Sequence, residues 1–340
     1  MIEYSLLLLL LLACELVYFK IAGSCGIIAG PLARSSHSGK VLSGGGVIFT
    51  LGIWLWSARC LACGEPVLWW FLAGLTLSAG ISLVDDIRSL PNSVRLVAQF
   101  VAMGLMFCQL DILHYVAWWG IVASLIVCVG AANIYNFMDG INGMTAGYSL
   151  SVLVPLFLLN RFRVEPAVTE GFVSEPLIVV TILATLVFSF FNFRPKGKAK
   201  CFAGDVGSVG MAFILLFMIG SLIVKTGDVT WLTFLIVYGV DGCLTICHRI
   251  MLHEHLGEAH RKHMYQLMSN ELGMSHVVVS LIYMAVQMAI SLVMVYLIPN
   301  TALAHWIYLL AVIVVLALVY LVFMKKYYHL HEKSLSLLSL

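Results

Sequence analysis

Long apolar segments alternate with short polar ones along the whole chain. Each apolar segment can cross about 30 Å of hydrocarbon as a helix of about 20 residues. The polar connections between them resemble neither a soluble domain nor a linker nor a repeat. The pattern therefore predicts an all-α, polytopic membrane protein with a single domain over residues 1–340. The eleven predicted spans lie near residues 3–19, 45–62, 67–85, 94–110, 113–131, 143–159, 176–191, 206–224, 229–247, 277–297 and 302–323.

Composition agrees with the apolar pattern. Of the 340 residues, 61% are hydrophobic and 11% are charged, a balance that excludes a soluble globular domain of this length. The nine cysteines are scattered, mostly within apolar segments, where a thiol acts as a small hydrophobic group. The net charge of +2 arises from Lys and Arg in a few connections, so we interpret it as an orientation signal and expect no nucleic-acid partner.

The charge distribution predicts how the chain crosses the membrane. The first span has no basic residue before it and Lys20 after it, which favours a membrane anchor with its N-terminus outside over a cleaved signal peptide. The connections after odd-numbered spans, and the C-terminus, then lie in the cytoplasm and hold fifteen of the nineteen Lys and Arg residues, a strong positive-inside bias. We expect these segments to build one site at the cytoplasmic face of the inner membrane: 20–44, 86–94, 132–143, 192–206 and 248–276.

Two adjacent acids end the third span in "SLVDDIRSLPNSVRL". Asp85 and Asp86 lie just before Pro91, where the helix must end. A carboxylate at a helix C-terminus typically costs about 0.3–1 kcal/mol, and ionisable groups at membrane depth are usually functional. We therefore predict a metal-binding or catalytic role for the two acids; the structural alternative is an interfacial pair balanced by Arg88.

Polar residues recur at every third position of "NIYNFMDGINGM". Asn133, Asn136, Asp139 and Asn142 would lie near one another on a helical or 3₁₀ turn. Amides and a carboxylate suit hydrogen bonding to a planar polar ligand and its hydroxyl groups. Capping of the following helix explains one of the four residues at most, so we predict a site for such a ligand.

The segment "FAGDVGSVG" places Gly204 and Asp205 directly before an apolar helix. Such a helix start binds phosphate, and an aspartate there can hold a hard cation. The segment "SGGG" at 43–46 is a weaker candidate of the same kind, because glycines also ease helix packing in membranes. No Walker motif occurs in the sequence, which argues against an ATP-driven pump.

The last long connection is rich in histidine. Zinc is disfavoured because H-E-x-x-H fails at Gly257 and because the neighbouring Arg261 would repel a cation. His260 and His263 are three residues apart and have basic neighbours, which suits an anion such as a diphosphate.

Together these segments resemble the polytopic polyprenyl-phosphate N-acetylhexosamine-1-phosphate transferases (glycosyltransferase family 4), which include the undecaprenyl-phosphate GlcNAc-1-phosphate and phospho-MurNAc-pentapeptide transferases. The resemblance covers residues 31–266, and "DDIRSLPNSVRLVAQ", "NIYNFMDGINGM" and "AKCFAGDVGSVG" are similar to motifs of the family. The segment "YGVDGCLTICHRIMLHEHLGEAHRKHMYQ" is similar to the subgroup that starts O-antigen and capsular polysaccharides.

The resemblance implies transfer of a sugar-1-phosphate from a UDP-N-acetylhexosamine to a polyprenyl phosphate, which gives a polyprenyl-diphospho-sugar and UMP. It implies Mg²⁺, with Mn²⁺ as an alternative, and we expect the metal on Asp205. Asp85 and Asp86 would be catalytic, and which of them is the base stays open. Nucleotide and sugar would bind at Asn133, Asn136, Asp139, Asn142 and Phe202, and phosphates at His37, Lys40, Lys200, His260, Arg261 and His263.

Some alternatives remain open at the level of sequence. The stretch "SGKVLS" departs from close relatives, which have a proline-containing stretch there, and "HRKH" departs from the continuous histidine run of cell-wall relatives, so a MurNAc-pentapeptide donor is not expected. The donor sugar, including 6-deoxy forms, is not specified. A transporter or flippase would need acids within opposed repeats, and a metalloprotease would need H-E-x-x-H. The sequence leaves a homodimer open.

Overall fold

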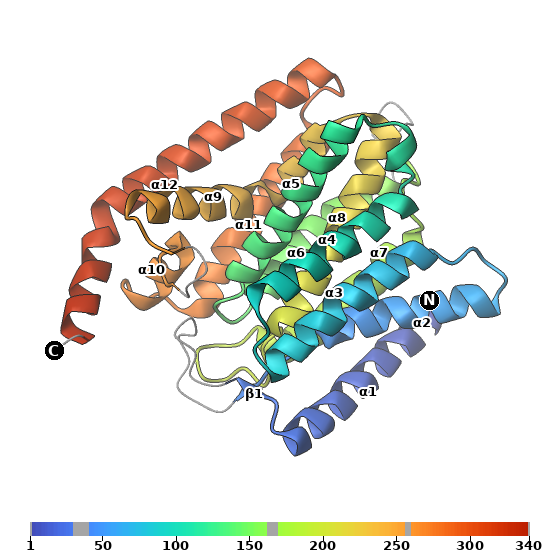
Figure 1. Cartoon of the computed structure of the whole chain (residues 1–340), viewed down its shortest axis with the longest axis horizontal. Coiled ribbons are helices and arrows are strands. Elements are labelled where there is room, and N and C mark those ends of the chain that lie inside the picture. Colours follow the sequence, from blue (N-terminus) through green and yellow to red (C-terminus); the bar gives the residue numbers. More distant parts are fainter. Residues whose placement is uncertain (1, 30–40, 162–168, 256–259, 339–340) are drawn as a thin grey trace.

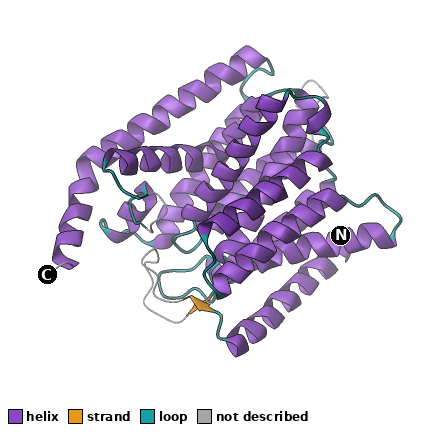
Figure 2. Cartoon of the chain, in the orientation of Figure 1, coloured by secondary structure: helices purple, strands orange, loops and turns teal. Residues whose placement is uncertain are grey.

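The computed structural model describes residues 2–29, 41–161, 169–255 and 260–338, and the side chains of 333–338 are not described. Helices make up almost all of this part of the chain (Figure 2). They are α1 Ile2–Cys25, α2 Val47–Ala62, α3 Trp69–Ile87, α4 Asn92–Gln109, η1 Ile112–His114, α5 Trp118–Phe137, α6 Met144–Arg161, α7 Glu175–Asn192, α8 Gly204–Thr226, η2 Val229–Leu235, α9 Ile236–Met251, α10 Met264–Asn270, α11 His276–Tyr296 and α12 Ala302–Leu338.

The chain is a multi-pass membrane protein. A helix lies over each of the eleven predicted spans, with η2 and α9 together covering the ninth. In the described residues, eight segments are long and apolar enough to cross a membrane: α1, α3, α5, α7, α8, η2 with α9, α11 and α12. Of the other three helices, α2 is shorter, with 16 residues. The exact number of crossings and their orientation stay predictions.

Two local features differ from the predicted all-α pattern. Strand β1 (Ile28–Ala29) pairs antiparallel with β2 (Val41–Leu42), so the fold is nearly rather than entirely helical. Helix α12 continues well past the predicted end at residue 323, to Leu338. The apolar pattern ends at Lys325 and Lys326, but Lys is itself a good helix former, so loss of hydrophobicity marks the end of a membrane span and not the end of a helix.

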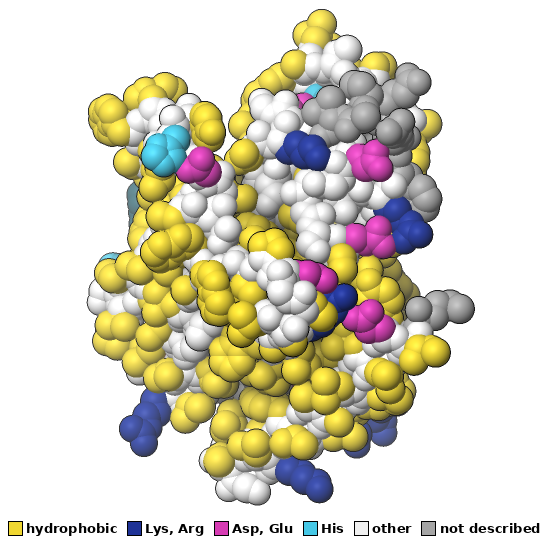
Figure 3. All heavy atoms as spheres, turned by 90° about the vertical axis from the view of Figure 1, so that its right-hand side faces the viewer, with side chains coloured by type: hydrophobic (Ala, Val, Ile, Leu, Met, Phe, Trp, Pro, Cys, Tyr) yellow, Lys and Arg dark blue, Asp and Glu magenta, His cyan; other side chains and the backbone are white. Residues whose placement is uncertain are grey.

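Helix α8 forms the centre of the bundle (Figure 1), and 83% of its most apolar stretch is buried. It packs against α2, α3, α5 and α6, which matches its apolar sequence on all sides. Where α2 and α8 begin, a Cβ on Gly46 would collide with the backbone of Gly207, so both glycines are required for this close approach. Much of the remaining helix surface is hydrophobic (Figure 3), as expected for contact with lipid.

The helices place the polar connections at two opposite ends of the bundle. Helices α3, α5 and α7 end, and α4, α6 and α8 begin, at one end, which we call the acidic end because Asp85, Asp86, Asp139 and Asp205 lie there. At the opposite end lie the connections α2–α3, α4–α5, α6–α7, α8–η2 and α11–α12. This alternation brings together connections that are distant in the sequence.

Candidate active site

An arginine joins two of the predicted acids. Arg95, in the first turn of α4, forms an ion pair with Asp85 at 3.0 Å and donates to Asp205 at 2.6 Å, which links the end of α3 to the start of α8. Asp85 also accepts a hydrogen bond from the backbone N–H of Leu90 at 2.6 Å. The three charged side chains are between 11% and 21% exposed, so solvent screens their attraction less than at a free surface.

Asp86 uses both carboxylate oxygens at the start of α8. One accepts from the N–H of Asp205 and the other from the N–H of Val206, both at 3.0 Å. The positive end of the α8 dipole thus offsets the unfavourable position of Asp86 at the end of α3. The amides at the start of α8, where the sequence predicts phosphate binding, are thus bound to a carboxylate of the same chain.

Asp139 brings a third connection to the cluster, from the turn between α5 and α6. Its carboxylate accepts a hydrogen bond from the Thr145 hydroxyl at 2.5 Å. The pKa of Asp139 is raised to about 8, chiefly by burial; the Thr145 hydrogen bond opposes this rise, and the charges of Asp205 and Asp86 contribute to it. Asp139 therefore lies within electrostatic range of the other acids, and four carboxylates share this region with Arg95.

The asparagines of the same segment have separate environments. Asn133 donates to the Gln99 side chain at 2.7 Å. Asn142 is fully buried and donates to the carbonyls of residues 194 and 195 at 2.8 and 3.0 Å, so it ties this turn to the end of α7. The side-chain nitrogen of Asn136 is buried and has no hydrogen-bond partner in the described chain. Asn136 is therefore the best placed of the three to donate to a ligand.

The glycines before α2 serve packing. The N–H groups of Gly45 and Gly46 donate to the carbonyls of Phe202 and Ala203 at 2.8 and 3.1 Å. These amides are engaged in backbone hydrogen bonds, so the packing interpretation of "SGGG" holds and they are not available to phosphate. Phe202 itself is partly exposed and Lys200 is exposed. The predicted phosphate-binding residues His37 and Lys40 lie outside the described residues.

The predicted histidines lie at the start of α10. The rings of His260 and His263 are 5.0 Å apart, centre to centre, and the ring of Phe137, at the end of α5, lies 6.5 Å from that of His263. Arg261 between them is partly exposed. The histidines are therefore close to the turn that carries Asp139, although more than a hundred residues separate them in sequence.

The loop before these histidines is held by ion pairs. Arg249 donates to Glu254 at 3.2 Å, and Lys262 pairs with the same carboxylate. Burial raises the pKa of Glu254, but the two cations outweigh it and hold that pKa below its ordinary value. Lys262 is thus neutralised by its own loop.

Three polar residues of this region were not predicted as functional. Arg95 lies in a segment that resembles a family motif. Its partner Asp205 is 110 residues away in the sequence, so their contact could not be predicted. Asp241 on α9 contacts His263 at 3.2 Å. Glu15 of α1 is fully buried beside Cys201, with one carboxylate oxygen that has no partner in the described residues. For Glu15 a single acid within an apolar helix was the sequence signal, and Asp241 in addition lies in the segment that resembles the polysaccharide-initiating subgroup.

The donor chemistry fits a hard cation, although no metal centre is pre-formed. Within the described ranges, no three His, Cys, Asp or Glu side chains are grouped as ligands. The four acids and Arg95 nevertheless carry an excess of negative charge when ionised, and carboxylate oxygens are the ligands that Mg²⁺ prefers.

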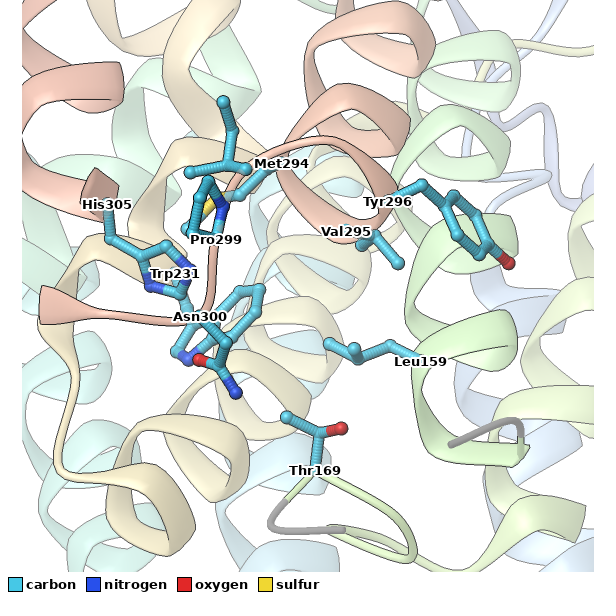
Figure 4. Close-up of a pocket in the computed structure, with 10 residues that line it drawn as sticks. Leu159, Thr169, Trp231, Met294, Val295, Tyr296, Pro299, Asn300 and His305 are labelled. Carbon is cyan, nitrogen blue, oxygen red and sulfur yellow. The ribbon is translucent and has the colours of Figure 1, made fainter. Parts of the chain in front are cut away.

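Among the hollows formed by the described residues, two near the bundle surface bear on the site. The more enclosed one is at the opposite end, where Figure 4 shows Trp231, Asn300 and His305 around it together with Thr169. It is remote from the acids, so enclosure alone does not identify the site. The other is an open apolar groove between α3 and α4 that begins next to Arg95 and is lined by Leu77, Ser93, Val94, Val97, Ala98 and Val101.

Known transferases are similar to this chain in sequence. Residues 68–224 match the model of glycosyl transferase family 4. The chain is 26% identical to a probable undecaprenyl-phosphate N-acetylglucosaminyl 1-phosphate transferase of Bacillus subtilis, over 81% of the chain and 78% of that protein. It is also 26% identical to the phospho-N-acetylmuramoyl-pentapeptide-transferase of Dictyoglomus thermophilum, over 62% of the chain and 65% of that protein. The enzyme of that name from Thermotoga neapolitana is 32% identical, over 27% of each chain.

Proposed function

We propose that this chain, which matches glycosyl transferase family 4 over residues 68–224 and is similar to the relatives named above, transfers a sugar-1-phosphate from a UDP-N-acetylhexosamine to a polyprenyl phosphate. The products are a polyprenyl-diphospho-sugar and UMP. We further propose that the reaction occurs at the cytoplasmic face of the inner membrane and starts an O-antigen, capsular or other envelope polysaccharide. The similarity to these relatives supports a sugar-phosphate transferase of cell-envelope synthesis; the donor, the membrane face and the pathway are the finer part of the proposal.

The convergence of acids at one end of the bundle carries this proposal. Asp85, Asp139 and Asp205 come from three separate connections, and Arg95 joins two of them. Phosphoryl transfer between two anionic substrates is catalysed mainly by positioning and by neutralising charge. A transporter would instead need acids along a path through the bundle.

The acids are suited to a divalent cation, which we propose to be Mg²⁺, or Mn²⁺ in its place. Asp205 would hold it, with a neighbouring carboxylate from the cluster. The bound ion would neutralise the donor diphosphate and the charge that grows on the leaving UMP. Arg95 supports this role because it fixes Asp205 against the end of α3.

The attacking group is the phosphate of the lipid acceptor, and the two adjacent acids are placed to act on it. Both oxygens of Asp86 are engaged by backbone amides of α8, which favours a positioning role. One oxygen of Asp85 is held only by the side chain of Arg95 and the other by a single amide. We therefore favour Asp85 as the group that accepts the proton of the lipid phosphate or aligns it.

The groove between α3 and α4 suits the tail of the acceptor. Its lining is apolar apart from Ser93, and it begins in the turn that carries Arg95. Val97 and Val101, which are 63% and 49% exposed, face outward along it. A polyprenyl tail in this groove would keep its carbon chain in lipid and bring its phosphate to Asp85.

The donor would lie on the other side of the acids. We assign its nucleotide and sugar to Asn133, Asn136 and Asp139, with Phe202 against uracil and the amide of Asn142 already used by the fold. Its phosphates would meet His260, Arg261 and His263, and Lys200, His37 and Lys40 would add positive charge around the attacking phosphate.

Release of UMP tests the proposal directly. Purified protein is incubated with undecaprenyl phosphate, Mg²⁺ and a panel of UDP-N-acetylhexosamines that includes 6-deoxy forms. We expect release from one or a few donors, none without the lipid acceptor, and none from UDP-glucose. Absence of UMP with every N-acetylhexosamine donor would refute the proposed function.

A further inference from the structure

A buried carboxylate on α9 holds the start of α10. Asp241 is 3% exposed. One of its oxygens accepts from the His263 ring, the backbone N–H of Met264 and the Thr245 hydroxyl, each at 3.2 Å. The other oxygen accepts from the Tyr283 hydroxyl on α11 at 2.6 Å. All four neighbours can donate a hydrogen bond, and the backbone amide can only donate. The carboxylate of Asp241 is therefore suited to accept from each of them.

His263 is fixed by these contacts but not satisfied by them. Its ring is 1% exposed, its backbone begins α10, and its N–H donates to the Gln266 side chain at 3.2 Å. Ring atom Nδ1 faces Asp241, whereas Nε2 is buried without a hydrogen-bond partner in the described chain. A buried polar atom left unpaired costs free energy and calls for an explanation.

The residues around the His263 ring lie at the acidic end of the bundle. The Tyr265 hydroxyl donates to the carbonyl of Phe137 at 2.8 Å, and that hydroxyl also lies against Gly140, where a Cβ would collide with it. Helix α10 therefore packs on the turn that carries Asp139. The ring of His263 lies beside those of Phe137 and His260.

We propose that Asp241 is a positioning residue that orients His263 toward the diphosphate of the nucleotide-sugar donor. Nδ1–H donates to the carboxylate of Asp241, and Nε2–H donates to a phosphate oxygen of the ligand. The carboxylate fixes the ring orientation and balances the charge of a doubly protonated imidazole, as carboxylates beside functional histidines do elsewhere. The inference rests on the proposed function for the identity of its ligand.

A binding experiment separates this role from a structural one. The affinities of UDP and UMP are measured by calorimetry for the wild-type chain, Asp241→Asn, His263→Gln and the double variant, each checked for monodispersity and thermal unfolding. Because UMP lacks the second phosphate, we expect UDP affinity to fall about tenfold in each single variant and UMP affinity to stay within twofold. The double variant should lose no more than His263→Gln alone.

Tyr283→Phe is the matched control. It removes the donor on the far oxygen of Asp241 and leaves the His263 contact in place, so we expect lower thermal stability with UDP affinity unchanged. Additive losses in the double variant, equal losses for UDP and UMP, or no UDP binding by the wild-type chain would each overturn the inference. Absence of turnover together with the expected UDP pattern would refute the proposed reaction but not the role of Asp241.

Discussion

Two arginines each bridge two carboxylates, one at each end of the bundle, and their surroundings differ. Arg59, at the opposite end, is 39% exposed and pairs with Glu3 at 2.6 Å and Glu65 at 2.8 Å. Arg95, at the acidic end, is 18% exposed. Solvent screens the first group, whereas the second lies among four acids. The same chemistry therefore ties down a loop at one end and organises a site at the other.

Two histidine–aspartate pairs repeat the contrast. At the opposite end, Asp228 accepts from His305 at 2.6 Å and from the backbone and hydroxyl of Thr230, so it caps η2. Burial raises the pKa of Asp228, but the hydrogen bonds from Thr230 and His305 outweigh it and hold that pKa below its ordinary value. At the acidic end, the pair of Asp241 and His263 leaves a ring nitrogen unpaired. The pair at the acidic end therefore keeps a buried ring nitrogen that a ligand could use.

Substitution of the two arginines should give the largest difference in UMP release. Arg95→Gln should lower UMP release about 100-fold, because it removes the cation that joins Asp85 to Asp205. Arg59→Gln should leave turnover within twofold. Turnover is measured at saturating donor and acceptor after gel filtration of each variant. Equal losses in both variants would mean that Arg95 acts on folding only.

The apolar groove gives an intermediate effect. Ala98→Phe places a large side chain among the groove residues and should raise the KM for undecaprenyl phosphate about tenfold, without changing the KM for the donor. Val122→Phe, on a lipid-exposed face of α5, is the matched control. A short-chain polyprenyl phosphate should be turned over equally by all three proteins. A loss that is the same for long and short acceptors would place the tail elsewhere.

The pair of His305 and Asp228 at the opposite end gives the smallest expected effect on activity. His305→Ala removes the ring that donates to Asp228 and should destabilise the folded chain by about 1–3 kcal/mol, with kcat and both KM values within twofold of wild type. Thermal unfolding and UMP release are measured on the same preparation. A selective fall in kcat without a fall in stability would show that the opposite end takes part in turnover.

Hydropathy predicts much of this molecule because a bilayer imposes one length and one composition on each crossing. For this reason helices lie over all the predicted spans. The same regularity allowed us to predict that five polar connections lie on one face of the membrane. The motif residues Asp85, Asp139 and Asp205 also lie at one end, as their place in odd-to-even connections requires.

Pairings between distant helices could not be predicted in this way. Periodicity predicts which face of a helix is polar but not which partner that face meets, so Arg95 with Asp205 and Asp241 with His263 appear only in the structure. The regular spacing of Asn133, Asn136, Asp139 and Asn142 suggested one continuous row. The helix ends at Phe137 instead, and the residues diverge into different contacts.

The most direct test of one shared acidic site is a Mg²⁺ titration of UMP release. Wild type, Asp205→Asn and Asp228→Asn are compared at saturating UDP-sugar and undecaprenyl phosphate. The account predicts saturable Mg²⁺ activation for wild type and Asp228→Asn, and a flat baseline for Asp205→Asn. Release that persists in a metal chelator, or an Asp205→Asn curve that overlies wild type, would contradict it.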